Sequence, residues 1–468
     1  MKTFYKKLIP GLLFLILSFT LTGQSPKYIF FYIGDGLNFN HVEAALVFQS
    51  KNVADHTPNL VFDRFPFTGI VNTRAASDYI TDSSAGGTAL ASGVRINNTA
   101  LGIDPDNKPV YSIIHKLQKQ NWSTGVITST SVDDGTPASF YAHALDRNSY
   151  YDIGTQAARS KINFLAGGGL KAYTNKNNPN DPHLLDVFKK NGYQVFKGID
   201  DYNKSKRKGN NILLIPDRIY PFPYVSLPYA IDRKSDELSL SDLTVTAINY
   251  LEKKKAGKFI LVVEGGRIDH ASHTNDGATV ILEVIDLAKS VQHAYDFYLR
   301  HPNETLIILT SDHETGGLGL GNYDLNLHVQ LLANQRISLS ALTSWISELK
   351  KQTPNTVQWE DIVQILKDNL GFWTNIPISS EDETKLKAEF KKTFIDHNES
   401  QVVTWYSKDE PLAVAAVGIL NRMSQLGWST TSHSGTPVPV YAIGAGAEHF
   451  TGSMLNTDIP KKIEKLIQ

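Results

Sequence analysis

Acidic and histidine side chains gather in one short run, EGGRIDHASH, which spans residues 264–273. Asp269 and His273 are four positions apart, so one helical turn would place them on the same face. A carboxylate beside an imidazole is a good pair of ligands for a divalent metal and favours zinc among the common ones. Glu264 ends an apolar stretch, and Arg267 and His270 complete the run. This density of charge at one strand end indicates a metal site rather than a surface adapted for solubility.

A stretch of small residues, TDSSAGGTALASG at 81–93, could carry a nucleophile. Ser83 would lie at the start of a helix, where free N–H groups and the helix dipole favour a bound anion. A serine there could accept a phosphoryl group. The alternative is an ordinary N-cap followed by a tightly packed helix, and this stretch alone does not decide between them.

A loop with carboxylates and a hydroxyl, Asp133, Asp134 and Thr136, is followed further along the chain by Arg147. Oxygen ligands bunched in a loop suit a hard cation. The planar guanidinium of an arginine nearby could hold two phosphate oxygens. A surface turn with a solvated arginine is the alternative.

Two more clusters follow or separate apolar runs, and the second of them joins two distant segments. Asp35 stands between two glycines after one such run, where capping of the next helix is the alternative role. The pair Asp312-His313 follows another run, and His433 lies in GWSTTSHSG at 427–435. Each cluster is weak evidence alone. Five clusters of ligand-type residues at strand ends or between strands together predict one site.

The elements that must position these clusters alternate in type. Short apolar, β-branched runs predict strands at 27–34, 68–73, 124–128, 259–263, 305–310 and 438–443. Amphipathic stretches predict helices at 110–120, 184–191, 243–255 and 279–299. This alternation predicts an α/β fold: a doubly wound, mostly parallel central sheet with helices on both faces. Ligands bind such sheets beyond the carboxyl ends of the strands.

Two segments interrupt the alternation. Residues 171–236, rich in Asn, Asp, Lys, Tyr and Pro, are interpreted as surface excursions. Residues 322–407 combine helical patterns with several aromatics, and they predict a small inserted subdomain. We expect its aromatics, Trp405 among them, to pack that subdomain rather than form a binding surface.

Composition excludes several classes of protein. The 468 residues include 46 Lys+Arg against 47 Asp+Glu, a balance that excludes a strongly basic nucleic-acid binder. The absence of cysteine excludes disulfide scaffolds, Cys-ligated metals and thiol catalysis.

Residues 1–23 have a basic start, an apolar run and a small residue before Gln24, the layout of a secretory signal. An uncleaved N-terminal anchor is the alternative. We expect a soluble, exported protein, periplasmic or secreted, with no membrane span in its mature chain 24–468.

Taken together, the five clusters resemble the alkaline phosphatase family, in order, through most of the chain outside the two irregular segments. TDSSAGGTALASG is similar to the family's nucleophile segment, and EGGRIDHASH is similar to its zinc-ligand segment. The resemblance implies that Ser83 is the nucleophile and Arg147 the phosphate-binding arginine. It also implies that Asp134 and His270 tune the binding of phosphate and of a magnesium ion, the third metal of the site. These two positions vary within the family, and Asp with His is a mixed pair relative to the residue combinations commonly seen there.

The resemblance further implies two zinc ions and one magnesium ion. The implied ligands of the first zinc are Asp269, His273 and His433. Those of the second zinc are Asp35, Asp312 and His313. The implied ligands of the magnesium are Thr136, Glu264 and Asp35, which would bridge to it.

The implied reaction is hydrolysis of phosphate monoesters through a phosphoserine. A phosphodiesterase or nucleotide pyrophosphatase of the same superfamily is the alternative, and the presence of both Arg147 and Glu264 favours the monoesterase. The modified nucleophile motif of sulfatases is absent from the sequence. A protein that only captures phosphate or metal would not need the full set of ligands and a nucleophile. Small phosphate monoesters are the expected partners, and a homodimer is compatible with the resemblance.

Overall fold

The computed structural model describes residues 25–52, 60–206, 208–219, 225–322, 325–352 and 356–468. The predicted signal segment, 1–23, lies outside the described residues. Within them, no helix has both the length and the apolar character needed to cross a bilayer.

A ten-stranded sheet forms the centre of the fold, with the strand order β16-β2-β15-β8-β1-β7-β3-β4-β6-β5. At its middle, β1 (Tyr28–Ile33) pairs in parallel with β7 (Phe259–Glu264) and β8 (Thr305–Thr310). On one side follow β3 (Ser123–Thr128), β4 (Phe164–Ala166), β6 (Asn211–Ile215) and β5 (Tyr193–Lys197), all parallel. On the other side β15 (Val438–Gly444) runs antiparallel between β8 and β2 (Phe67–Asn72), and β2 pairs in parallel with β16 (Gly452–Leu455). The predicted mostly parallel sheet is confirmed.

The central strands are apolar on both faces because helices cover both. Every residue of β7 and β8 is buried. Along β1, Phe30 and Tyr32 enter one hydrophobic core, whereas Ile29, Phe31 and Ile33 enter the other. This alternation follows from the two-residue period of a strand.

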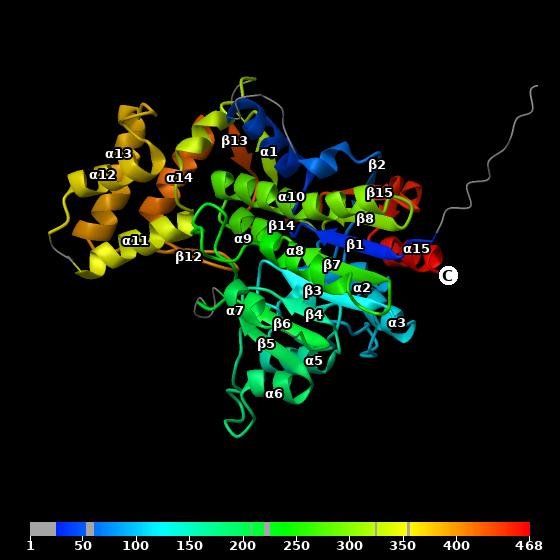
Figure 1. Cartoon of the computed structure of the whole chain (residues 1–468). Coiled ribbons are helices and arrows are strands. Elements are labelled where there is room, and N and C mark those ends of the chain that lie inside the picture. The colour runs from blue at the N-terminus through cyan, green and yellow to red at the C-terminus, as the bar shows by residue number, and fades with distance from the viewer. Residues whose placement is uncertain (1–24, 53–59, 207, 220–224, 323–324, 353–355) are drawn as a thin grey trace, which may run out of the picture.

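The helices divide between the two faces of the sheet (Figure 1). The first core contains side chains of α1 (Phe39–Asn52), α8 (Leu240–Leu251) and α10 (Gly277–Arg300). The second contains side chains of α2 (Ser83–Ser92), α3 (Ile113–Lys119), α5 (Tyr150–Arg159), α6 (Leu184–Lys190) and α15 (Asp458–Leu466). The doubly wound architecture is therefore confirmed.

The interpretation of residues 171–236 as surface excursions is wrong in part. Besides α6, which confirms the helix predicted at 184–191, this segment contains α7 (Gly198–Lys204) and two strands of the sheet, β5 and β6. Four of the five residues of β6 are buried. The strands are short and lie between polar loops, so the composition of the whole segment hides them.

Three helices of the segment 322–407 form a group beside the sheet, on the left in Figure 1. They are α11 (Leu339–Gln352), α12 (Trp359–Leu370) and α13 (Ser380–Phe390), and α14 (Pro411–Met423) packs against α11 and α13. Rings of Trp359, Trp373 and Phe390 pack edge to face inside the group. The chain leaves the group through a short hairpin of β11 (Val402–Val403) and β12 (Lys408–Asp409).

Six further short elements position residues of the site or pair with one another. They are α4 (Gly135–Ala138), α9 (Arg267–His273), β9 (Glu314–Thr315), β10 (Leu318–Leu320), β13 (Leu426–Trp428) and β14 (His433–Ser434).

Candidate active site

The predicted site residues follow the carboxyl ends of adjacent parallel strands. Asp35 comes two residues after β1, Glu264 ends β7, and Asp312 comes two residues after β8. Thr136 lies in α4, which follows β3. These strands are neighbours in the sheet, so their ends bring residues far apart in sequence to one edge.

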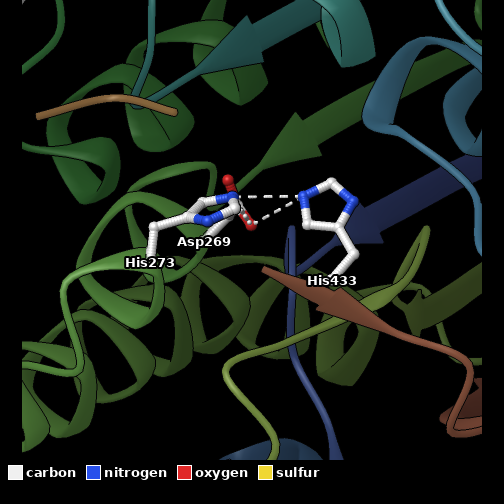
Figure 2. Close-up of side chains that lie close together, drawn as sticks. All are labelled: Asp269, His273 and His433. Carbon is white, nitrogen blue, oxygen red and sulfur yellow. Dashed lines mark hydrogen bonds and ion pairs between the residues drawn. The ribbon is translucent and has the colours of Figure 1, made fainter. Parts of the chain in front are cut away.

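One cluster of possible metal ligands consists of Asp269, His273 and His433, all buried. Figure 2 shows the two imidazoles and the carboxylate turned toward one another. His273 Nε2 lies 3.3 Å from Asp269 Oδ1 and 3.2 Å from His433 Nε2, and His433 Nε2 lies 3.5 Å from the same Asp269 oxygen. Asp269 and His273 occupy successive turns of α9, whereas His433 arrives on β14, which pairs with β9.

The outer ring nitrogens of both histidines are held by backbone carbonyls. His273 Nδ1 lies 2.6 Å from Thr431 O, and His433 Nδ1 lies 2.8 Å from Thr81 O. Each Nδ1–H donates to its carbonyl, which leaves the Nε2 lone pair facing the cluster. This is the arrangement that orients a histidine to bind a metal.

A second cluster consists of Asp35, Asp312 and His313, also buried. His313 Nε2 lies 3.3 Å from Asp35 Oδ1 and 3.4 Å from Asp312 Oδ2. The His313 ring stacks on the His433 ring with centroids 3.5 Å apart, so the two clusters adjoin.

The electrostatics of the clusters favour bound cations. Burial, with the charges of Asp312 and Asp269, raises the pKa of Asp35 well above its ordinary value. Burial, with Asp269, raises the pKa of Asp312 to about 6. The buried Asp269 Oδ2 has no hydrogen-bond partner. Buried carboxylates are costly unless paired or bound to metal, so this donor set fits divalent ions.

A third group of oxygen ligands adjoins the second cluster. Thr136 Oγ1 lies 3.4 Å from Asp35 Oδ2 and 3.3 Å from Asp312 Oδ2. Glu264 is buried nearby and accepts hydrogen bonds from the hydroxyls of Thr128 and Thr130. Burial raises the pKa of Glu264 to about 8.

Ser83 is the first residue of α2, and its hydroxyl points toward the second cluster. Its Oγ lies 3.1 Å from His313 Nε2. The hydroxyl of Ser84 instead donates to the carboxylate of Asp82, the N-cap of the helix. The close approach of α2 to the end of β8 requires a glycine, because a Cβ on Gly86 would lie 2.9 Å from the backbone oxygen of Asp312.

Arg147 is held by two carboxylates. Its Nη1 lies 3.3 Å from Asp82 Oδ2, and its Nη2 lies 3.3 Å from Asp134 Oδ1. The other oxygen of Asp134 contacts Lys171 Nζ at 2.8 Å. Although burial acts to raise the pKa of Asp134, Lys171 and Arg147 together hold it well below its ordinary value.

Sequence reasoning missed Lys171, because it opens the segment interpreted as surface excursions. Its side chain is 6% exposed, and its backbone N–H donates to both oxygens of Asp133. Its position shortly after β4 could have identified it, because the carboxyl end of that parallel strand lies at the same edge of the sheet as the other site residues.

His270 lies between a cation and an aromatic ring. Its Nδ1 lies 3.0 Å from Arg267 Nη1, and its ring stacks on Tyr406 with centroids 4.1 Å apart. Burial, with the charge of Arg267, lowers the pKa of His270 to about 3. The structure therefore keeps this imidazole neutral near pH 7.

The expectation that the aromatics of 322–407 only pack the insertion is wrong for Trp405 and its neighbour Tyr406. Between β11 and β12, the hairpin tip places Trp405 over the first cluster, with ring centroids 5.4 Å from His273 and 4.8 Å from His433. The tip contributes to a cleft of about 1110 Å³, which Asp82, Arg147 and Lys171 also line. A hairpin that comes from the insertion carries no local signal that it folds back onto the sheet edge.

Comparison with known proteins agrees with this geometry. The family model described as alkaline phosphatase matches residues 26–468. Alkaline phosphatase 4 of Bacillus subtilis is 33% identical over 447 residues, which are 93% of this chain and 87% of the relative. The structure of the cold-active alkaline phosphatase of the psychrophile Shewanella sp. superposes with a TM-score of 0.78 at 28% identity, covering 94% of this chain and 99% of that one.

The alkaline phosphatase of Thermus thermophilus shares the fold, with a TM-score of 0.76 at 24% identity, over 95% of this chain and 92% of that one. The chain therefore belongs to the alkaline phosphatase family, the metal-dependent hydrolases of phosphate monoesters.

Proposed function

We propose that this phosphatase works through a phosphoserine at Ser83, with two zinc ions and one magnesium ion. The observation that carries the proposal is the position of the Ser83 hydroxyl, 3.1 Å from His313 Nε2 at the second cluster and at the start of a ten-residue helix. Ser84 is adjacent, yet its hydroxyl is bound to Asp82.

The donor sets support the metal assignment. Asp269, His273 and His433 would hold one zinc, since imidazoles with a carboxylate favour that metal. Asp35, Asp312 and His313 would hold the other. Asp35, Thr136 and Glu264 offer only oxygens and would hold magnesium. When bound, the ions supply Lewis-acid stabilisation of the attacking and leaving oxygens.

The chain's own residues prepare the displacement at phosphorus. Ser83 gives its hydroxyl proton to solvent, its Oγ bonds to phosphorus, and the bond from phosphorus to the leaving oxygen breaks, so that this oxygen leaves with the electron pair and takes a proton from solvent. Water then cleaves the phosphoserine, which releases inorganic phosphate and restores the hydroxyl. The N-terminal N–H groups of α2 favour the phosphoryl charge throughout.

Arg147 would hold two non-bridging phosphate oxygens through its fork of N–H groups. Its ion pairs with Asp82 and Asp134 fix the plane of the guanidinium, and the side chain as a whole is 11% exposed. Lys171 pairs with the other oxygen of Asp134 and balances part of its negative charge. The attraction of Asp134 for Arg147 is thereby weakened, so the carboxylate does not draw Arg147 away from the phosphate. We propose this as the tuning role of Asp134. His270, kept neutral, would tune the third metal by limiting the positive charge nearby.

The experiment that tests the nucleophile compares Ser83→Ala with Ser84→Ala. We expect that no labelled phosphopeptide can be trapped from substrate in Ser83→Ala. The activation free energy should rise by several kcal/mol, which lowers the rate by on the order of 10³-fold or more. Ser84→Ala should keep substantial activity and the label. A label found on Ser84 would refute the assignment.

The metal assignment is tested by elemental analysis of active enzyme. We expect two zinc equivalents and one magnesium equivalent per chain. Fewer than two transition-metal equivalents in fully active enzyme would contradict the two-zinc arrangement.

We also propose that residues 24–468 form one catalytic domain with 322–407 inserted in it, and that the protein is exported. The signal-like composition of 1–23 supports export. Fractionation of cells that express the full chain tests this, and light scattering of the purified protein tests whether it forms a homodimer.

A further inference from the structure

The cleft above the site has an aromatic wall that the hydrolysis reaction itself does not require. Trp405 lines it and is 59% exposed, even though one part of its ring contacts the histidines of the first cluster. Tyr79 also lines it and is 61% exposed. Two large exposed aromatic side chains in one concave site are typical of a surface that a ligand covers.

The positions of the two clusters indicate which part of a substrate this wall would meet. The Ser83 hydroxyl points to His313 in the second cluster, whereas Trp405 lies over His273 and His433 in the first. In phosphoryl transfer the attacking and leaving oxygens lie roughly in line on opposite sides of phosphorus. With Ser83 as nucleophile, the leaving group therefore extends on the side of Trp405.

The size and lining of the cleft indicate what kind of leaving group fits. At about 1110 Å³ it is as large as sites that hold drug-sized ligands, far more than a phosphate needs. One part carries the cations Arg147 and Lys171 together with the carboxylates of Asp78 and Asp82, the latter paired with Arg147. Tyr79, Ile80 and Trp405 contribute rings and an apolar side chain. This combination suits a molecule with an anionic end and a flat aromatic end.

We propose that Trp405 and Tyr79 form a stacking site for the aromatic leaving group of a nucleoside monophosphate. The proposal rests on the assignment of Ser83 and Arg147 made above. Stacking of a base on an aromatic side chain is sequence-tolerant, because every base presents a π face. The enzyme would then prefer nucleoside monophosphates over alkyl monoesters of similar charge.

The test compares kcat/KM for adenosine 5′-monophosphate and for glycerol phosphate in the metal-loaded enzyme. We expect Trp405→Ala to lower the ratio of the two values by roughly 5- to 100-fold, the usual range for loss of one stacking contact. Tyr79→Ala should lower it in the same direction. Trp345→Ala is the matched control, since Trp345 lies in the same insertion, is 53% exposed and is absent from the lining of this cleft.

A second measurement does not depend on turnover. Adenosine binding to the enzyme, followed by calorimetry, should weaken in Trp405→Ala and recover in Trp405→Phe, which keeps a ring. Zinc content is measured in each variant, because Trp405 contacts two proposed ligands. A substrate ratio and an adenosine affinity that both stay at wild-type values in Trp405→Ala and Tyr79→Ala would overturn the proposal. Failure of the wild type to hydrolyse glycerol phosphate would instead count against the proposed function.

Discussion

Replacing Gly135 by alanine would move Arg147 without removing any charged group. Gly135 opens α4, and the guanidinium of Arg147 lies directly against it. A Cβ at this position would lie 2.7 Å from Nη2 and 2.8 Å from Cζ of Arg147. The guanidinium has little freedom to yield, because Asp82 and Asp134 hold it from two sides.

The size of the effect follows from the contact distance. Ordinary van der Waals contact begins near 3.4 Å, so the guanidinium must shift by at least about 0.7 Å from its present 2.7 Å. A misplacement of about 1 Å in a positioning group can cost roughly 10²-fold in rate. We therefore expect kcat/KM for p-nitrophenyl phosphate to fall about 10- to 100-fold in Gly135→Ala, which is about 1.4–2.7 kcal/mol. The inhibition constant of inorganic phosphate should rise in parallel.

The assay includes zinc and magnesium content and a matched control. Gly418→Ala in α14 adds the same methyl group where nothing lies within 4 Å, so it should keep wild-type activity and gain up to about 1 kcal/mol of stability. Wild-type kcat/KM and wild-type phosphate inhibition in Gly135→Ala, at full metal content, would refute the view that the two carboxylates pin Arg147 in its working position.

Four further predictions concern charge and metal. Arg147→Ala should cost about 2–4 kcal/mol with p-nitrophenyl phosphate and less with bis-p-nitrophenyl phosphate, because a diester lacks one of the oxygens that the guanidinium holds; equal losses would argue against this role. Lys171→Met should destabilise the fold by about 3 kcal/mol in urea unfolding, since it breaks a buried ion pair with Asp134, and Lys171→Arg should recover part of the loss. Burial raises the pKa of Glu283 from 4.5 to about 7, so the folded state keeps a proton that the unfolded state releases. The contribution of Glu283 to stability is then greatest below about pH 4.5 and declines by on the order of 3 kcal/mol as pH rises to about 7, and a wild-type pH dependence in Glu283→Gln would contradict this. Chelation should abolish activity and added zinc restore it, and acid should weaken zinc binding because a protonated imidazole cannot bind metal; a chelated enzyme that remains active would count against all of the metal assignments.

Much of the fold could be predicted because its signals are local. The apolar runs that become β1, β7 and β8 are continuous since both faces of those strands are buried, and such runs are visible without knowing their neighbours. β6 has a shorter apolar run, ILLI, which the polar composition of the whole segment 171–236 hides. β5, YQVFK, has no continuous apolar run, so only its pairing with β6 distinguishes it from the polar loops beside it.

The same contrast holds in the site. The candidate ligands were predictable because the parallel topology places strand ends at one edge, and the chain puts Asp, Glu and His there. The choice between Ser83 and Ser84, by contrast, depends on a side-chain direction: one hydroxyl faces His313 and the other binds the N-cap carboxylate. No spacing in a run of two serines determines that.

By itself, the sequence determined which residue types could do chemistry and that they stand at strand ends, since both follow from composition and short-range periodicity. Only the tertiary structure decided which of them meet and what surrounds them. Lys171 reaches Asp134 from a different loop, and Trp405 reaches His433 from a hairpin at the end of the insertion. These contacts depend on how distant segments pack over the sheet edge, and packing between distant segments leaves no periodic trace in either one.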